Sequence, residues 1–275
     1  MKGPRMRIRK FIPPVSIVLF LLLTLAGTYY VRLRIFERHM AVAMEMDDGK
    51  AIAELMDFWP CPLNARGKYS QTPLLWAAGA GRLGIVKQLL SRGVDVNARD
   101  IAGHTPLIWA LFKGQPEIAS FLISAGADVR AVDCFGRTAL HAAACRGDRR
   151  NLERLIALGA DVNRKDNNGS FPLHWAVRGA WEDTEFVVLS FSEGEYLTDE
   201  FRLTGGRRRS AKDSPPRTGL PAVEVDGNKE TTAVLIAHGA DANAKDRDGK
   251  TPLKWAADLG YNGIAEILRK AGAKD

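Results

Sequence analysis

A 33-residue period constrains this chain more than any other feature of its sequence. The tripeptide Thr72-Pro73-Leu74 returns with small changes at residues 105–107, 138–140, 171–173 and 251–253. The first three intervals are 33 residues each and the last is 80, which is 33 plus 47. A second marker, Gly-x-Asp-Val-Asn, keeps the same spacing at residues 93–97, 126–129, 159–163 and 239–243. Two markers with one period predict a repeat protein, in which each unit buries its apolar face against its neighbours.

Each unit carries residue types that begin and end helices. Thr before Pro predicts a helix start, because the Thr side chain can cap free N–H groups and Pro lacks only a donor that has no partner there. Residues such as Val86 and Leu89 fall at helical spacing and predict a buried face. Gly93 and its equivalents follow these helices, where a left-handed C-cap favours Gly. The Asp-x-x-Gly sequences at 100–103, 133–136 and 166–169 predict turns.

The combination of Thr-Pro-Leu-His-x-Ala, a central Gly, an apolar second helix and Gly-Ala-Asp-Val-Asn resembles the ankyrin repeat. The resemblance covers residues 39–275 apart from one insertion. It implies an all-α solenoid of stacked helix pairs with β-turn fingers, used to bind proteins. By this register the repeats lie near residues 39–66, 67–99, 100–132, 133–165, 166–245 and 246–275.

The 47 extra residues fall between the two helices of the fourth full-type repeat, at 181–226, so that its second helix is expected to resume at Gly227. Loops of this length are uncommon unless they are functional or disordered. Residues 181–203 are acidic and β-prone, and Ser192-Glu193-Gly194 could turn a hairpin. Residues 205–221 have the composition of a disordered segment.

The N-terminal part of the chain predicts a membrane anchor before the repeats. A basic tail at residues 1–10 precedes residues 11–31, which carry no charge and are long enough as a helix to cross a bilayer. The excess of basic residues before this segment places the N-terminus in the cytoplasm and the repeats on the far side, which is the periplasm if the protein is bacterial. Two alternatives stay open. One is a cleaved signal peptide with a site at Thr24-Leu25-Ala26, which would export a soluble array, and the other is an array that faces the cytosol.

The net charge of +7 does not indicate a nucleic-acid partner. Residues 1–40 hold eight basic residues and one acidic residue, so the remaining chain sums to zero. A nucleic-acid groove needs excess positive charge on the folded part. We therefore assign the basic pI to the membrane-flanking residues.

We predict no catalytic, cofactor or metal site. The Gly-x-Gly-x-x-Gly sequence at 79–84 lies between two helices, whereas a dinucleotide loop follows a strand. His141, Cys145 and His174 are too few for zinc, and the ankyrin resemblance implies that both His side chains link adjacent units by hydrogen bonds. The Trp residues share one repeat position and are expected in the core: Trp76, Trp109, Trp175 and Trp255. Cys61, Cys134 and Cys145 are odd in number, and we expect no pairing between the last two.

The ankyrin resemblance places the protein-binding residues at the turn tips and at the exposed ends of the first helices, along a concave face. By register these residues are Tyr69, Gln71, Ile101, His104, Phe112, Lys113, Phe135, Arg137, Arg146, Asn168, Ser170 and Arg178. Phe112 and Phe135 are apolar where exposure is expected, and aromatic residues with Arg are typical of binding hot spots. We therefore predict a non-catalytic, membrane-anchored scaffold that binds a protein partner. The alternatives are a catalytic or regulatory subunit whose activity lies in residues 181–226, an exported binding module, and a purely structural tether.

Overall fold

The structure is a computed structural model that describes residues 35–57 except 36, 45 and 47, residue 63, and residues 65–179 and 222–274. The predicted tail at 1–10, the predicted membrane anchor at 11–31, Cys61, and the predicted hairpin and disordered segment within 181–221 lie outside these residues. In the part of the chain that is described, no helix is both long and apolar enough to span a bilayer.

The chain divides into two compact units, residues 1–67 and residues 68–275. In the first unit, residues 37–44 and helix α2 (Gly49–Asp57) are helical, in the region of the repeat predicted near residues 39–66. Met40, Ile52 and Met56 are buried there.

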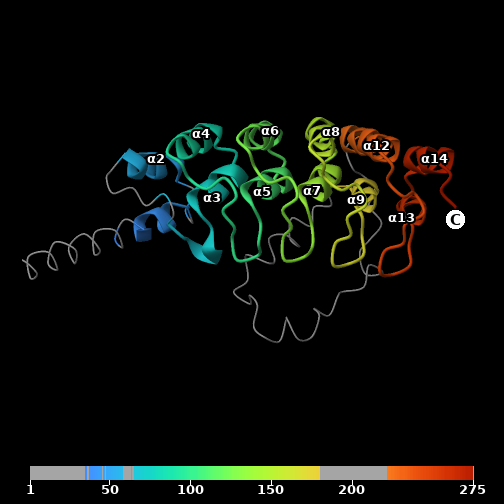
Figure 1. Cartoon of the computed structure of the whole chain (residues 1–275), viewed down its shortest axis with the longest axis horizontal. Coiled ribbons are helices and arrows are strands. Elements are labelled where there is room, and N and C mark those ends of the chain that lie inside the picture. The colour runs from blue at the N-terminus through green and yellow to red at the C-terminus, as the bar shows by residue number, and fades with distance from the viewer. Residues whose placement is uncertain are drawn as a thin grey trace, which may run out of the picture. The chain divides into compact units, whose positions relative to one another are not determined.

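The second unit consists of successive helix pairs joined by projecting turns, which we call fingers (Figure 1). The first helices of the pairs form an inner row, and the second helices form an outer row that packs on it. The inner helices are α3 (Pro73–Gly79), α5 (Pro106–Phe112), α7 (Ala139–Arg146), α9 (Pro172–Arg178) and α13 (Pro252–Leu259). The outer helices are α4 (Leu83–Ser91), α6 (Pro116–Ser124), α8 (Arg149–Ala157), α12 (Ala222–Ala237) and α14 (Asn262–Lys270). The residues described contain no strand. Besides the α-helices they contain one short 3₁₀ helix, η1 (Lys68–Ser70), and one isolated β-bridge in a finger.

The inner helices begin where the repeated tripeptide predicts. The Thr72 hydroxyl accepts the backbone N–H of Leu75 at 3.3 Å, and Thr105 and Thr251 cap α5 and α13 in the same way. Phe171 has no hydroxyl, and there the Nδ1 atom of His174 accepts the backbone N–H of Phe171 at 3.3 Å. Nδ1 of His141 accepts the backbone N–H of Thr138 in the same way at 3.1 Å, so the His side chain caps the residue before the helix and not the N–H that Thr caps.

The Asn of the second marker joins neighbouring repeats on the side of the outer helices. Asn163 accepts the N–H of Asp241 at 3.0 Å and donates to the carbonyl of Gly239 at 2.9 Å, across the whole insertion. Asn97 accepts the N–H of Asp128 in the same way. Arg130 stands where Asn is expected, and it donates instead to the carbonyl of Gly159 at 3.2 Å.

The fourth repeat differs from the others at the turn between its helices. In the other repeats of the array this turn has a Gly with positive φ, as at Gly147 (φ 66°) and Gly260 (φ 74°), but Ala180 stands at this position. The short turn is less favourable for a residue with a Cβ atom. Its outer helix α12 begins at Ala222, earlier than the expected start at Gly227.

Candidate protein-binding surface

Four of the fingers are built around one Asp whose carboxylate organises the turn, and three of these Asp residues, Asp100, Asp133 and Asp166, are buried. Oδ1 of Asp133 accepts the backbone N–H groups of Phe135 at 2.9 Å and Arg137 at 2.8 Å. Asp100, Asp166 and Asp246 accept the equivalent two N–H groups in their own fingers. The Asp-x-x-Gly prediction of a turn is confirmed, and the reason is that one carboxylate oxygen accepts the N–H groups of the residues two and four positions further on.

Adjacent fingers are hydrogen-bonded to one another through the backbone. The N–H of Cys134 donates to the carbonyl of Ala102 at 2.9 Å, and the N–H of Asn167 donates to the carbonyl of Phe135 at 2.8 Å. The same bond links the first finger to Ile101 and the last finger to Asn168. The fingers of the array therefore form one continuous row, which fixes the positions of their tips.

The tip of each finger carries a different side chain on this constant framework. Ile101, Cys134, Asn167 and Arg247 share one register position, and all four are exposed. Ile101 is 50% exposed and places a large apolar side chain at its tip. The residues that hold the fingers repeat along the chain while the tips vary, so the tips are free to determine which surface the array recognises.

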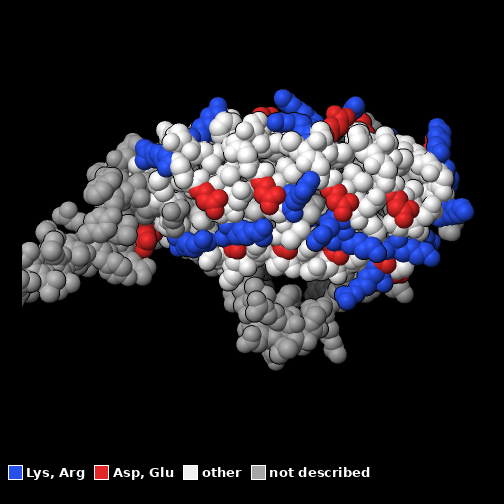
Figure 2. Space-filling view, in the orientation of Figure 1, with Lys and Arg blue, Asp and Glu red and all other residues white. Residues whose placement is uncertain are grey.

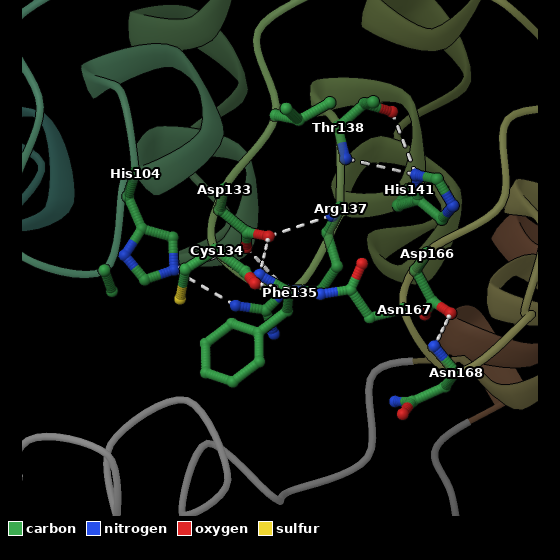
Figure 3. Close-up of polar contacts among 12 residues, drawn as sticks. His104, Asp133, Cys134, Phe135, Arg137, Thr138, His141, Asp166, Asn167 and Asn168 are labelled. Carbon is green, nitrogen blue, oxygen red and sulfur yellow. Dashed lines mark hydrogen bonds and ion pairs between the residues drawn. The ribbon is translucent and has the colours of Figure 1, made fainter. Parts of the chain in front are cut away.

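A buried polar cluster lies directly behind the tips and links two fingers (Figure 3). Nε of Arg137 donates to Oδ2 of Asp133 at 2.6 Å, and Nη2 of Arg137 lies 3.1 Å from Nε2 of His104. Nδ1 of His104 lies 3.0 Å from Oδ2 of Asp100. An imidazole that donates from Nδ1 to Asp100 and accepts at Nε2 from Arg137 satisfies all of these contacts. The cluster therefore joins the repeats at 100–132 and 133–165.

The repeat at 133–165 uses Arg137 where the fourth and last repeats use Trp. In the fourth and last repeats the indole N–H of Trp175 and of Trp255 donates to the finger Asp, at 3.0 and 2.8 Å. Ala142 stands at the Trp position in the repeat at 133–165, so Asp133 receives the Arg137 guanidinium instead. This guanidinium lies between two aromatic rings, 4.7 Å from the centroid of Phe112 and 4.6 Å from that of Phe135.

Cationic side chains gather at the C-terminal ends of three successive inner helices. Lys113, Arg146 and Arg178, which we call the helix-end cations, follow or end α5, α7 and α9. Burial and the nearby charge of Arg146 both lower the pKa of Lys113. Nε of Arg146 donates to the carbonyl of Phe112 at 2.7 Å. Lys113 lies 5.0 Å from the ring centroid of Trp109, and Arg178 lies at the same distance from that of Trp255.

We call the fingertips together with the helix-end cations the binding face. Arg137, Phe112 and Phe135 connect its two parts, because Phe112 ends α5 and Phe135 lies in a finger. The face shown in Figure 2 has charges of both signs, because acidic and basic side chains form parallel rows along the array there. Positive and negative charges are therefore mixed on that face.

The structure corrects four of the residues for which exposure was predicted. His104, Phe112, Arg137 and Ser170 are only 1%, 4%, 3% and 4% exposed. His104 and Arg137 are taken up by the polar cluster, and Phe112 packs against Arg137 and Trp175. The remaining predicted residues are exposed or half-buried and stay candidates for partner contact: Tyr69, Gln71, Ile101, Lys113, Phe135, Arg146, Asn168 and Arg178. The prediction omitted Cys134, Asn167 and Arg247, which the register of Ile101 could have identified.

The two His residues of the inner helices link adjacent repeats, as the resemblance implies. Nε2 of His174 lies 3.1 Å from the carbonyl of Lys250, and Nε2 of His141 lies 3.4 Å from the carbonyl of Ser170. Burial lowers the pKa of His141 to about 3 and also lowers that of His174. Within the described ranges no group of three or more His, Cys, Asp or Glu side chains could hold a metal ion.

Cys134 and Cys145 are free thiols, and both have a raised pKa. Burial and then the charge of Asp133 raise the pKa of Cys134 to about 11. The thiolate is the reactive form of Cys, so this fingertip thiol is a poor nucleophile near neutral pH.

Comparison with known families agrees with this geometry. A model described as ankyrin repeats (3 copies) matches residues 39–133 and 123–190, and one described as ankyrin repeats (many copies) matches residues 221–269. The chain belongs to the ankyrin-repeat family. Ankyrin repeats suggest a role in protein–protein interaction, and the all-helical array with β-turn fingers is the fold of this family.

Individual relatives match only part of this ankyrin-repeat chain. Potassium channel AKT1 of Oryza sativa, in both subspecies indica and japonica, is 30% identical over 87 residues, which cover 32% of this chain and 9% of the channel. Protein phosphatase 1 regulatory subunit 27 of Mus musculus is 49% identical over 69 residues, which cover 24% of this chain and 45% of that protein. The chain thus spans less than half the length of each of these relatives.

Proposed function

We propose that this protein is a non-catalytic scaffold whose ankyrin array captures a protein partner on the binding face, which is the concave side of such an array. The observation that carries this proposal is the hydrogen-bonded row of fingers, which holds variable tips in fixed positions next to aromatic and cationic side chains. Fixed positions favour affinity, because little conformational entropy is lost when the partner binds. The match to a regulatory subunit supports a non-catalytic role.

The proposal includes attachment to a membrane through residues 11–31, with the repeats on the far side of the bilayer. Its support is the uncharged sequence and the excess of basic residues before it. Membrane fractionation of the full chain and of a variant without residues 11–31 tests the anchor. Protease accessibility of the repeats in sealed vesicles tests the topology. Extraction of the intact chain by high salt would contradict the anchor.

The chain offers a matched pair of positions for testing the binding face. Ile101 lies on a fingertip and is 50% exposed, whereas Leu158 follows the outer helix α8 and is 51% exposed. A photo-crosslinking amino acid is placed at each position in turn. The full-length protein is expressed in cells of the organism that naturally produces it. We expect a discrete crosslinked partner from position 101 and none from position 158. Equal crosslinking from both positions, or crosslinking from position 158 alone, would refute the proposed binding face.

Aspartate variants at the same positions provide a second readout. Ile101→Asp is expected to weaken partner capture at least about tenfold, because a large apolar contact is replaced by a charge. Leu158→Asp is expected to leave capture unchanged. Both side chains are half exposed, so the melting temperature of each variant should stay near that of the wild-type chain.

A further inference from the structure

A stripe of exposed apolar side chains runs along the first helix of the unit at residues 1–67. Ile35, Val42 and Met46 are 49%, 43% and 75% exposed. Their spacings of seven and four residues place them on one side of a helix. The N–H of Met46 donates to the carbonyl of Val42 at 2.9 Å, so the helical turn extends to Met46 and keeps it in line with Val42. We call these three residues the apolar stripe.

The packing of this unit does not use the apolar stripe. The opposite side of the same helix carries Met40, Ala43 and Met44, and these side chains are buried. The helix is therefore apolar on two sides, of which only one is covered. Single exposed apolar residues are common, but several large ones on one helix side indicate a contact surface.

The other helix of the unit, α2, has a charged outward side. It presents Lys50 and Glu54, whose side chains are 88% and 65% exposed and whose charged groups lie 3.8 Å apart. Such a pair one helical turn apart is typical of a helix side in contact with water. The two helices of one unit therefore differ in what their outward sides contact.

The place of the apolar stripe in the sequence indicates what covers it. Ile35 follows the uncharged segment at 11–31 by four residues, which span at most about 14 Å when fully extended. The headgroup layer of a bilayer begins where a membrane-spanning segment ends. Arg32, Arg34 and Arg38 lie at this end of the helix, and Arg38 is exposed. Basic residues beside an apolar helix side are typical of helices that lie at a lipid surface.

We infer that the apolar stripe lies on the surface of the bilayer into which residues 11–31 insert, with its side chains at the boundary between headgroups and acyl chains and Arg38 among the lipid phosphates. The inference rests on the proposed membrane attachment and adds a second contact with the same membrane. A second copy of the chain fits the stripe less well. Three partly exposed side chains fall far short of the roughly 800 Å² per partner that a standard protein interface buries.

The test is fluorescence quenching in the full-length chain, reconstituted in vesicles of phosphatidylcholine and phosphatidylglycerol. The vesicles contain a lipid with a nitroxide near the headgroup, which quenches a fluorophore only over a short distance. A fluorescent amino acid is placed at position 42, at position 46, or at the control position 54, which is exposed on α2 of the same unit. We expect quenching at positions 42 and 46 to be at least about threefold stronger than at position 54.

A pair of variants separates the apolar contact from simple closeness to the anchor. The fluorophore is placed at position 39, which is exposed on the same helix. Val42→Asp combined with Met46→Asp should lower its quenching to the level of position 54, because a charge is costly to bury among acyl chains. Val42→Leu combined with Met46→Leu keeps the stripe apolar and should leave the quenching unchanged. Neither variant replaces a buried side chain, so both should keep the packing of the unit.

The inference is overturned if positions 42, 46 and 54 are quenched equally, or if the aspartate variant is quenched as strongly as the leucine variant. It is also overturned if a photo-crosslinker at position 42 links the chain to a second copy or to another protein in place of lipid. A chain that stays in the membrane at high salt while positions 42 and 46 are not quenched would remove only this inference. Extraction of the chain by high salt would remove the proposed anchor as well.

Discussion

Burial distinguishes two Arg–carboxylate pairs that are otherwise alike, and replacing each Arg with Leu measures the difference. Nε of Arg137 lies 2.6 Å from Asp133, and Nε of Arg149 lies 2.8 Å from Glu153; both pairs are four residues apart. The side chains of the first pair are 4% and 0% exposed, and those of the second are 54% and 44% exposed. The two pairs therefore compare one interaction in two environments.

We expect Arg137→Leu to destabilise the array by about 3 kcal/mol. Removal of one partner from a buried ion pair typically costs about 3–5 kcal/mol, because a charge is left buried without compensation. Asp133 keeps two backbone N–H donors, which places the cost near the lower limit. His104 also loses a donor to its Nε2 atom. Arg149→Leu is expected to leave the stability almost unchanged, since exposed pairs contribute little.

Amide hydrogen exchange of the full-length chain is the appropriate assay, because repeat arrays need not unfold in a single step. A cost of 3 kcal/mol corresponds to about a hundredfold loss of protection at the amides of Cys134 and Asn167, which bond to neighbouring fingers. Arg137→Lys keeps the charge but not the planar donor group, and should fall between Leu and wild type. The reasoning fails if Arg137→Leu and Arg149→Leu lose the same stability.

Three further perturbations test other parts of the array. Ser70 has a φ of 58°, in the left-handed region, at the finger position that Gly103 occupies in the next repeat. Ser70→Gly should therefore raise the free energy of unfolding, measured by guanidinium titration, by about 0.5–1 kcal/mol. A decrease would show that the backbone at Ser70 is not strained. Asn163→Ala removes two bonds to the next repeat and should cost about 1–2 kcal/mol, seen as faster exchange of the Asp241 amide; unchanged exchange would show that this link is dispensable. His141 has a folded-state pKa of about 3, which is below its unfolded value of about 6.5. Its contribution to stability is therefore complete above pH 6.5 and is lost as the pH falls toward 3. The loss amounts to at most about 1.4 kcal/mol per pH unit. His141→Gln should flatten this decline, and an identical pH profile would exclude His141 as its source.

Local chemistry that recurs with the period could be predicted from the sequence. The Thr caps, the Asp turns, the links made by His141 and His174, and the burial of most of the repeated Trp residues all depend on residues close together in one repeat or at one register position. Trp175 is the exception, because it is only half-buried.

Exposure on the binding face could not be predicted in the same way. Phe112 was expected on the surface, but it lies against Arg137 of the following repeat and Trp175 of the repeat after that. Arg137 is drawn inward because Ala142 replaces Trp and leaves Asp133 without an indole donor. The side chains of three repeats decide this together, and register alone does not describe their combined packing.

The amino-acid sequence by itself determined that this chain is a stack of helix pairs, where the inner helices start, and which residues turn most of the fingers. These features follow from short-range hydrogen bonds and from the spacing of apolar residues, which are the same in every unit. Only the tertiary structure decided which side chains of the predicted concave face are buried, and that Arg137 joins two fingers through Asp133 and His104. The physical reason is that burial and electrostatic compensation depend on the side chains of neighbouring repeats, and these differ from one repeat to the next.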